Sequence, residues 1–466
     1  MANLSATNDS SLHNVLEYGY SSVPIIQGRL NGVYSKHPAF TIVLSIMLVY
    51  MSLVAYFRFN NVNRLKTKHG FTADARSFEK MTVEQAQEVQ RNMAEWDFPA
   101  LYEFGWLIEF FKTCTAPSVS KVICETGHFT NPDPLLAHAR QQDTVCLMTA
   151  MTAQPLGSIF SALCLARINE HHNTYGHRIN SDTVLWLLWM FMWGPTHWIN
   201  RGGWRKLEPF EVHAQWVLWR ELSVRMGCKW VPTYLFELQH FREQYVLQEQ
   251  KPSKWNTTFS DAIMDDITYK VPSLLKPAAR KCVIAVLDLD VVWANGYAAE
   301  YSSVLRQILF GILKTWGLFQ RYFCLPRVWG RVLTPAQVND NGLMNFPDYT
   351  FPNTPYYVET TFWNQWGPWA WLDILSGMPR PSAELGANGV KWESMGAKMK
   401  DPSLQLASES RVRAQAMEIL RQGWGYRAKV KYQPKSLVVD KHYGPGYGSR
   451  DNAYTEKELE AKGPWK

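Results

Sequence analysis

The chain has 466 residues, of which 46% are apolar and 19% charged, and its net charge is +7. This composition is typical of a folded protein with a sizeable core and argues against a disordered chain. The positive charge is modest and no basic run alternates with stacking aromatics, so nucleic acid is not an expected partner. Seven dispersed cysteines without a CxxC motif indicate neither a disulfide scaffold nor a zinc knuckle, and they suit a reducing compartment.

The first predicted element is an apolar segment, Ala39–Phe57, whose 19 residues carry no charge. As a helix it spans roughly 28 Å, which is enough to cross the hydrocarbon core of a bilayer. Four basic residues follow it closely: Arg58, Arg64, Lys66 and Lys68. Only two, Arg29 and Lys36, precede it. The positive-inside rule therefore predicts a single-pass anchor, with the large C-terminal part of the chain in the cytosol.

The domain organisation follows from this anchor and from later changes in composition. We expect a short lumenal tail (1–38), the transmembrane anchor (39–57), a basic juxtamembrane linker (58–95), a helical catalytic domain (96–330), a loop-rich extension with one late helix (331–440) and a flexible charged tail (441–466). Asn3 and Asn8 begin N-glycosylation sequons, in agreement with a lumenal tail.

Capping residues and helix breakers predict an all-α body. The expected helices run from Asp133-Pro134 to about Thr149, from Gly157 to near Gly176, from Asn180 to a stop at Gly194-Pro195, from Pro209 to Gly227, onward from Pro232, through much of 278–323, and from Ser408 to Gln422. The tryptophan-rich stretch Val184–Trp193 is too short to cross a membrane and is predicted to be a buried helix.

The sequence lacks the residues that several known kinds of catalytic or cofactor site require. A carboxylate-bridged di-iron centre takes two Glu-x-x-His pairs on helices, and only Glu237 with His240 falls in a predicted helix, because Glu125 and His128 are separated by the helix breaker Gly127. No facial-triad iron motif, cysteine-ligated haem loop, dinucleotide fingerprint, P-loop or HExxH motif is present. The remaining candidates are histidines and charged residues on helices.

One predicted helix carries Arg140, Asp143 and Thr144 at i, i+3 and i+4, which places them on one face. Burying such a face is costly unless it meets a charged or polar partner, and a haem with its two propionates is one such partner. The next helix carries His171 and His172, and a neutral imidazole is the usual protein ligand to haem iron. The alternative is an ordinary ion pair between Arg140 and Asp143, with both histidines facing solvent.

Spacing alone does not choose between the two histidines. His172 continues a stripe with Leu165 and Ile168, whereas His171 shares its stripe with Arg167. The apolar stripe slightly favours His172.

An ordered series of motifs then resembles a known family. The motifs are Pro117-Ser-Val-Ser-Lys121, Thr126-Gly-His-Phe129, Arg140-x-x-Asp-Thr144, Arg167-Ile-Asn-x-x-His172-x-x-Tyr175, Asn180-Ser-Asp182, Pro195-Thr-His-Trp198, Trp204-Arg-Lys-Leu207, Trp219-Arg-Glu-Leu-Ser-Val-Arg-Met-Gly227 and Leu325-Pro-Arg327. The series resembles the fungal, endoplasmic-reticulum-bound oxygenases of the MpaB type, which share a superfamily with bacterial latex-clearing proteins.

The resemblance implies a helical, globin-related domain that binds haem b. It implies His172 as the axial iron ligand and Arg140 and Thr144 as pocket residues, with Arg167 as the basic residue that leads into the histidine helix. Both Arg140 and Arg167 are expected to bind the cofactor by offsetting the charge of the haem propionates. The latex-clearing branch has a lysine where this chain has Asp143. Polyisoprene is therefore not an expected substrate, and Asp143 together with Thr144 is predicted to serve catalysis, the aspartate by assisting proton transfer.

The implied activity is oxidative cleavage or oxygenation by O2 of a C=C bond in a prenyl or other lipophilic chain, in secondary metabolism at the endoplasmic reticulum membrane. Two alternatives stay open: a non-catalytic haem-binding sensor or carrier, and a cofactor-free helical interaction protein. Retention of Arg140, Thr144 and His172 argues against the last.

Two aromatic groups have two interpretations each. Trp186, Trp189 and Trp193 recur at helical spacing and either line the pocket or, as we favour, belong to the core. The stretch Trp363–Trp371 is either an interfacial patch through which a lipophilic substrate passes, or a loop packed on the core, which we favour.

Overall fold

The computed structural model describes residues 38–228, 230–232, 234–334, 338–347, 355–375, 377–396 and 401–424. Within these ranges the chain is helical, and its only β pairings are two isolated bridges, Met344 with Val390 and Phe346 with Val358. The all-α prediction is confirmed. Asn3, Asn8 and the predicted tail 441–466 lie outside the described residues.

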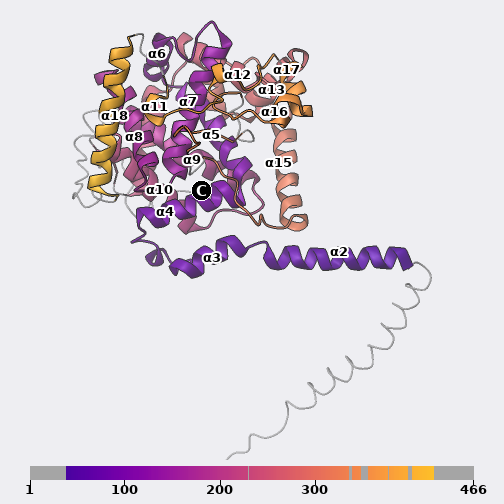
Figure 1. Cartoon of the computed structure of the whole chain (residues 1–466). Helices are drawn as coiled ribbons and strands as arrows, with labels where there is room; N and C mark the ends of the chain where they lie inside the picture. The colour runs from indigo at the N-terminus through magenta and orange to yellow at the C-terminus, as the bar shows by residue number, and fades with distance from the viewer. Residues whose placement is uncertain are drawn as a thin grey trace, which may run out of the picture. The chain divides into compact units, whose positions relative to one another are not determined.

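The helices are labelled as in Figure 1. The α-helices are α2 (Pro38–Phe57), α3 (Asn60–His69), α4 (Val83–Arg91), α5 (Pro99–Thr113), α6 (Pro117–Thr126), α7 (Pro134–Ala153), α8 (Ile159–Asn173), α9 (Ser181–Gly202), α10 (Pro209–Arg225), α11 (Leu235–Glu249), α12 (Lys254–Ile267), α13 (Lys276–Val286), α14 (Leu289–Ala294), α15 (Ser303–Phe323), α16 (Phe362–Trp366), α17 (Pro368–Leu375) and α18 (Pro402–Gln422). Short 3-10 helices are η1 (Ala75–Ser77), η3 (Gly176–Arg178), η4 (Ser273–Leu275), η5 (Ala383–Leu385) and η6 (Trp392–Ser394), and η2 (Asn92–Asp97) is a π-helix.

The chain forms two compact units. Unit 1 comprises α2 up to Asn60 together with Gln320–Pro326, and unit 2 comprises the remaining described residues. In the described part of the chain, one helical stretch, Pro38–His69, is long and apolar enough to cross a membrane, judged by length and composition. This stretch contains the predicted apolar segment.

Unit 2 is built on pairs of packed helices. Helix α5 packs along α9, α7 along α8, and α10 on α4, while α18 lies beside α8 at an edge of the helical body (Figure 1). The predicted N-terminal caps at Asp133 and Asn180 are confirmed: their side chains accept hydrogen bonds from backbone N–H groups in the first turns of α7 and α9. The side chain of Ser158, which was not predicted as a cap, does the same for α8. These caps fix where the helices that carry the candidate site begin.

Helix α9 does not stop at Gly194, as predicted, but continues to Gly202 with Pro195 inside it. Because Pro195 has no N–H, the carbonyl of Phe191, four residues earlier, loses its usual donor. The indole Nε1 of Trp106, on α5, donates a hydrogen bond of 2.8 Å to that carbonyl instead. Packing between α5 and α9 therefore sustains a helix that its local sequence would break.

Two other predicted helix starts are wrong. The late helix begins at Pro402, not at Ser408, because Asp401 accepts a hydrogen bond from the Ser403 N–H and caps it there. The helix expected from Pro232 begins at Leu235. The helical pattern between residues 278 and 323 is divided among α13, α14 and α15.

The two aromatic groups separate clearly. Trp186 is buried and stacks on Tyr245 with ring centroids 4.9 Å apart, and Trp189 stacks on Trp193 at 5.1 Å. None of these three tryptophans lines either of the two cavities described below, so they belong to the core as favoured.

By contrast, the stretch Trp363–Trp371 forms α16 and α17, and its four tryptophans are more than half exposed. A loop packed on the core, the interpretation favoured for this stretch, is therefore wrong.

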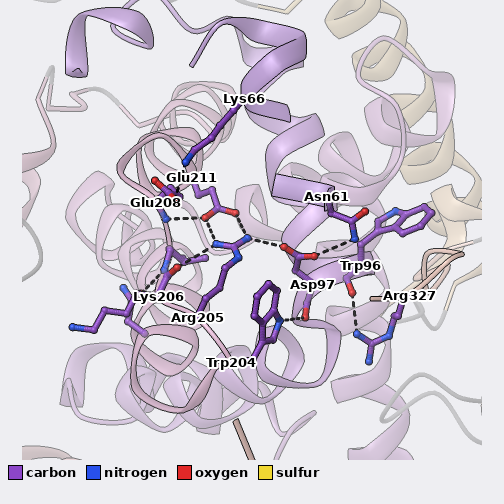
Figure 2. Close-up of polar contacts among 12 residues, drawn as sticks. Asn61, Lys66, Trp96, Asp97, Trp204, Arg205, Lys206, Glu208, Glu211 and Arg327 are labelled. Atoms are coloured by element: carbon purple, nitrogen blue, oxygen red, sulfur yellow. Dashed lines mark hydrogen bonds and ion pairs between the residues drawn. The ribbon is translucent and has the colours of Figure 1, made fainter. Parts of the chain in front are cut away.

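A buried ion cluster joins α3, η2 and α10 around Arg205 (Figure 2). The guanidinium of Arg205 donates to Asp97 Oδ2 at 2.6 Å and to both carboxylate oxygens of Glu211, at 2.6 and 2.8 Å. On the rim of the cluster, Asn61 donates to Asp97 and Lys66 pairs with Glu208. The two carboxylates raise the pKa of Arg205 against the opposing effect of burial. This cluster fixes α3, at the start of unit 2, to the helices behind it.

Candidate functional site

A cavity of about 180 Å³ lies among α5, α6, α7, α8 and α9. Most of its wall is apolar, with contributions from Phe110, Val119, Leu147, Ile168, Leu188 and Phe191. Its polar lining includes His172, Arg140 and Thr144. The structure thus brings together three of the five residues predicted for the site.

His172 lies in the last turn of α8 and lines this cavity. Its Nδ1 atom is buried, and no described residue hydrogen bonds to it. Burial, together with the positive charge of Arg140, lowers the pKa of His172 to about 4. The imidazole is therefore neutral at pH 7 and keeps a lone pair available to a metal.

His171 also touches the cavity, but its ring is already engaged. Its Nε2 lies 3.1 Å from the carbonyl oxygen of Met395, which can only accept a hydrogen bond. Gly396, at φ +91°, is packed so closely against this ring that a side chain there would collide with it. Burial and the nearby Arg167 and Arg140 lower the pKa of His171 to about 3. Two adjacent histidines thus differ in what they can offer a ligand.

Arg140 is the cationic group that faces the same cavity from α7. Its Nη1 donates to the hydroxyl of Thr144 at 2.8 Å, and its guanidinium lies 5.3 Å from the ring centre of Phe129. Among the described residues, no carboxylate forms a salt bridge with it, and burial lowers its pKa. A buried guanidinium without a carboxylate partner is suited to bind an anionic group of a ligand.

Asp143, on the same helix, lines neither of the two cavities. Its Oδ1 accepts a hydrogen bond of 2.6 Å from the hydroxyl of Tyr357, and burial beside this carboxylate raises the pKa of Tyr357. Tyr357 has a φ of +60°, a conformation that is costly for a bulky residue and persists only where its surroundings hold it. The geometry therefore assigns Asp143 a role in fixing the extension, and its predicted part in proton transfer stays untested.

Arg167 is fully buried but lies outside the lining of both cavities. Its Nε donates to the carbonyl of Met395 at 2.6 Å and its Nη1 to the hydroxyl of Ser408 at 3.0 Å. Both partners belong to the C-terminal extension. This guanidinium thus holds the extension against α8. Because it lines neither cavity, it does not contact a ligand bound in one of them.

A second, larger cavity of about 300 Å³ adjoins the first. The two share four lining residues, Phe110, Thr144, Met148 and Phe191. Together they reach the size range of ligand pockets in proteins. Thr144 therefore stands at the boundary between two adjoining spaces of mostly apolar character.

The second cavity has two charged places in its wall. Glu103 pairs with Arg331 at 3.1 Å, and burial raises the pKa of Glu103 to about 7 although Arg331 opposes the rise. Asp266 is paired with the buried His138, and burial raises the pKa of this aspartate as well. The rest of the lining is aromatic or aliphatic in the main, so this space is suited to an apolar ligand with few polar groups.

Sequence reasoning missed several residues that the structure places at the site. His128 and Tyr175 line the first cavity, and both stand inside motifs that carry the family resemblance, so that signal was available. Tyr357 and Met395 reach the site from the extension, and no periodicity or spacing predicts those contacts. In the described ranges no group of three or more His, Cys, Asp or Glu side chains could hold a metal ion.

The fold and the cavities define a helical protein with an internal ligand site that pairs a neutral imidazole with a buried arginine. Comparison with known proteins relates the chain to oxygenases. It is 25% identical over 397 residues to the ER-bound oxygenase mpaB′ of Penicillium brevicompactum, which covers 79% of this chain and 88% of the relative. It is also 25% identical over 402 residues to the ER-bound oxygenase mpaB of the same organism, covering 80% of this chain and 92% of the relative.

A third relative, the ER-bound oxygenase mpaB of Penicillium roqueforti, is 22% identical over 285 residues, or 58% of this chain and 94% of the relative. No family model matches the chain. The predicted resemblance to the MpaB-type oxygenases is confirmed by these similarities, which extend well beyond the motifs that first indicated it. The relatives support an enzyme of the oxygenase kind.

Proposed function

We propose that the chain is a membrane-anchored, haem-dependent oxygenase that acts with O2 on a C=C bond in a prenyl or other lipophilic chain. The observation that carries the proposal is the pairing, across one apolar cavity, of His172 with Arg140. One is a neutral imidazole with a buried nitrogen that no described residue hydrogen bonds, and the other is a part-buried guanidinium that forms no salt bridge with a described carboxylate, although the charge of Asp143 lies near it. An axial nitrogen ligand and a cation that can pair with a propionate both suit a haem b.

The residues present fit this cofactor in a specific way. His172 would hold the iron, because His171 already meets the carbonyl of Met395. Arg140 would hold a propionate, with Thr144 keeping its guanidinium in place through the 2.8 Å hydrogen bond. Arg167 is not proposed as a haem contact, since it lines neither cavity and donates instead to Met395 and Ser408.

When bound, the haem would supply the iron that activates O2 for reaction with the alkene. The chain's own residues would orient the reactants and exclude water. Phe110, Met148 and Phe191 form an apolar boundary between the two cavities, and Thr144 is the polar residue at that boundary. We place the lipophilic substrate in the larger cavity, because its aromatic and aliphatic wall suits a prenyl chain and it adjoins the space of His172.

We also propose that α2 anchors the protein in the endoplasmic reticulum membrane, with unit 2 on the cytosolic side. Three features support this: the apolar span, the basic residues that follow it, and the printed description of the relatives as ER-bound. The exposed tryptophans of α16 and α17 suit a headgroup region through which a membrane-dissolved substrate could reach the cavity. A catalyst so placed works where its substrate dissolves.

The absorption spectrum of the purified full-length protein, reconstituted with haem, tests the proposal. We expect a Soret band in the wild type and its loss or marked shift in His172→Gly, with recovery on addition of free imidazole. His171→Gly is the matched control and should keep the wild-type band. A wild type that does not bind haem, or a band that is unchanged in His172→Gly, contradicts the proposal.

Turnover separates an oxygenase from a haem-binding carrier or sensor. A prenylated aromatic compound is supplied with ¹⁸O₂ to the reconstituted protein, and we expect a carbonyl or carboxyl product that carries the label. Haem binding without any labelled product across a panel of prenylated compounds would favour the carrier. The adjoining cavity of about 300 Å³ favours the enzyme, since a carrier has no need of a second ligand space.

A further inference from the structure

Helix α15 is apolar on two opposite sides. On its inner side, Phe310 and Leu313 pack against the hydrophobic core cluster of unit 2. One turn further, Gly317 is buried so close to the backbone of α9 that a Cβ there would lie 2.6 Å from the carbonyl oxygen of Gly202. The inner side is thus fully used by contacts with the protein.

The outer side carries a second apolar stripe, which is exposed. Its residues recur every three or four positions and are between 44% and 66% exposed: Val304, Ile308, Ile312, Trp316, Phe319 and Phe323. A helix of a soluble protein normally turns its polar face outward, and an aligned stripe of this length marks a surface that contacts something apolar. In Figure 1, α15 stands at an outer edge of the helical body.

Charge on α15 points to lipid as the covering partner. The helix has three basic residues, Arg306, Lys314 and Arg321, and no acidic one. Lys314 and Arg321 are exposed, and each stands two residues from stripe members, so they lie on the other side of the helix from the stripe. A basic polar side opposite an apolar side is the arrangement of helices that lie in the interface of an anionic bilayer.

The end of α15 belongs to the same compact unit as the apolar helix α2. In unit 1 the hydroxyl of Tyr50, on α2, donates to the carbonyl of Phe323 at 2.8 Å. Nearby, Arg58 donates to the carbonyls of Cys324 and Leu325 at 3.4 and 3.5 Å. Where α2 enters a bilayer, the last turn of α15 must therefore be at the bilayer surface too.

We propose that α15 is a second membrane element, which lies in the interface of the leaflet that faces unit 2 with its outer stripe among the lipid chains. It does not cross the bilayer, because in the described ranges only Pro38–His69 is long and apolar enough to do so. The proposal rests on the proposed anchoring by α2. It gives the enzyme a fixed orientation on the membrane, which one flexible anchor alone would not.

Photo-crosslinking of the full-length protein in nanodiscs of phosphatidylcholine and phosphatidylserine tests this proposal. The photoreactive residue p-benzoylphenylalanine replaces Ile312 on the outer stripe, Ile46 on α2 as the positive control, or Met417 on α18 as the control for an exposed apolar position elsewhere. We expect lipid adducts at Ile312 and Ile46 in comparable yield, and at least a tenfold lower yield at Met417.

Different failures have different meanings. Adducts at Ile46 but not at Ile312, or a crosslink from Ile312 to a second copy of the chain, would overturn the proposal for α15 and leave the anchor intact. Equal lipid labelling at Met417 would overturn it as well, because the contact would then not be specific to the stripe. No adduct at Ile46 would reject the anchoring itself, and with it the inference.

Discussion

At the scale of single residues, the site depends on which polar groups already have partners. Arg140 is partly buried on α7 and Arg167 fully buried on α8, but only Arg140 reaches the cavity of His172. Arg167 instead donates hydrogen bonds to the carbonyl of Met395 and the hydroxyl of Ser408. The family resemblance alone suggested both for the cofactor, and their contacts now separate them.

Substitution of the two arginines tests this separation. Arg140→Gln removes a charge-assisted contact to a propionate, so haem affinity should fall about 10- to 100-fold. Arg167→Gln is the matched variant and should lower thermal stability while keeping the wild-type haem affinity. Both affinities are measured by titration of the apoprotein with haem. Equal losses in the two variants, or a loss only in Arg167→Gln, would contradict the assignment.

Glu103 gives a pH-dependent test of the larger cavity. Burial raises its pKa to about 7, above the value near 4.5 of an exposed glutamate, so the folded state holds a proton that the unfolded state releases between these pH values. The wild type should therefore lose stability as the pH rises from about 5 to 8, by at most about 3 kcal/mol. Glu103→Gln cannot titrate, so its melting temperature relative to the wild type should increase over that range. A difference that is flat or falls with pH would show that Arg331 keeps this carboxylate ionised throughout.

At the scale of helices, local signals predicted most of the elements and failed where tertiary contacts override them. The cap at Asp133-Pro134 is recognisable because its chemistry lies within one turn. The expected stop at Gly194-Pro195 is wrong because the missing donor is replaced by Trp106, which is 85 residues away from Phe191 in sequence. The residues around Pro195 do not by themselves predict the hydrogen bond from Trp106.

The contribution of the Trp106 hydrogen bond to the free energy of unfolding can be measured. Trp106→Phe leaves the Phe191 carbonyl without its hydrogen bond in a packed interface, and we expect a loss of about 1–3 kcal/mol in the free energy of unfolding. Pro195→Ala restores an N–H at that position, so it should stabilise the Trp106→Phe variant more than it stabilises the wild type. A double-mutant cycle by chemical denaturation gives the coupling. Additive effects would mean that the indole is not acting for the missing backbone donor.

At the scale of the whole chain, the candidate site depends on segments that are distant in sequence. Helices α5 to α9 provide the cavity, and their order and motifs allowed the histidine and arginine to be predicted. The contributions of the extension were not predictable, because Tyr357 meets Asp143 across 214 residues and lies in a segment without helical periodicity. The proposed division into six parts remains a prediction, and the two compact units do not follow its boundaries.

The central claim is that His172, and not its neighbour, holds the haem iron. Resonance Raman spectroscopy of the ferrous, haem-reconstituted full-length protein addresses this bond directly. We predict an iron–nitrogen stretching band that shifts when the protein is labelled with ¹⁵N-histidine, that is absent in His172→Gly and that is retained in His171→Gly. A band that persists in His172→Gly, or that disappears only in His171→Gly, would contradict the account.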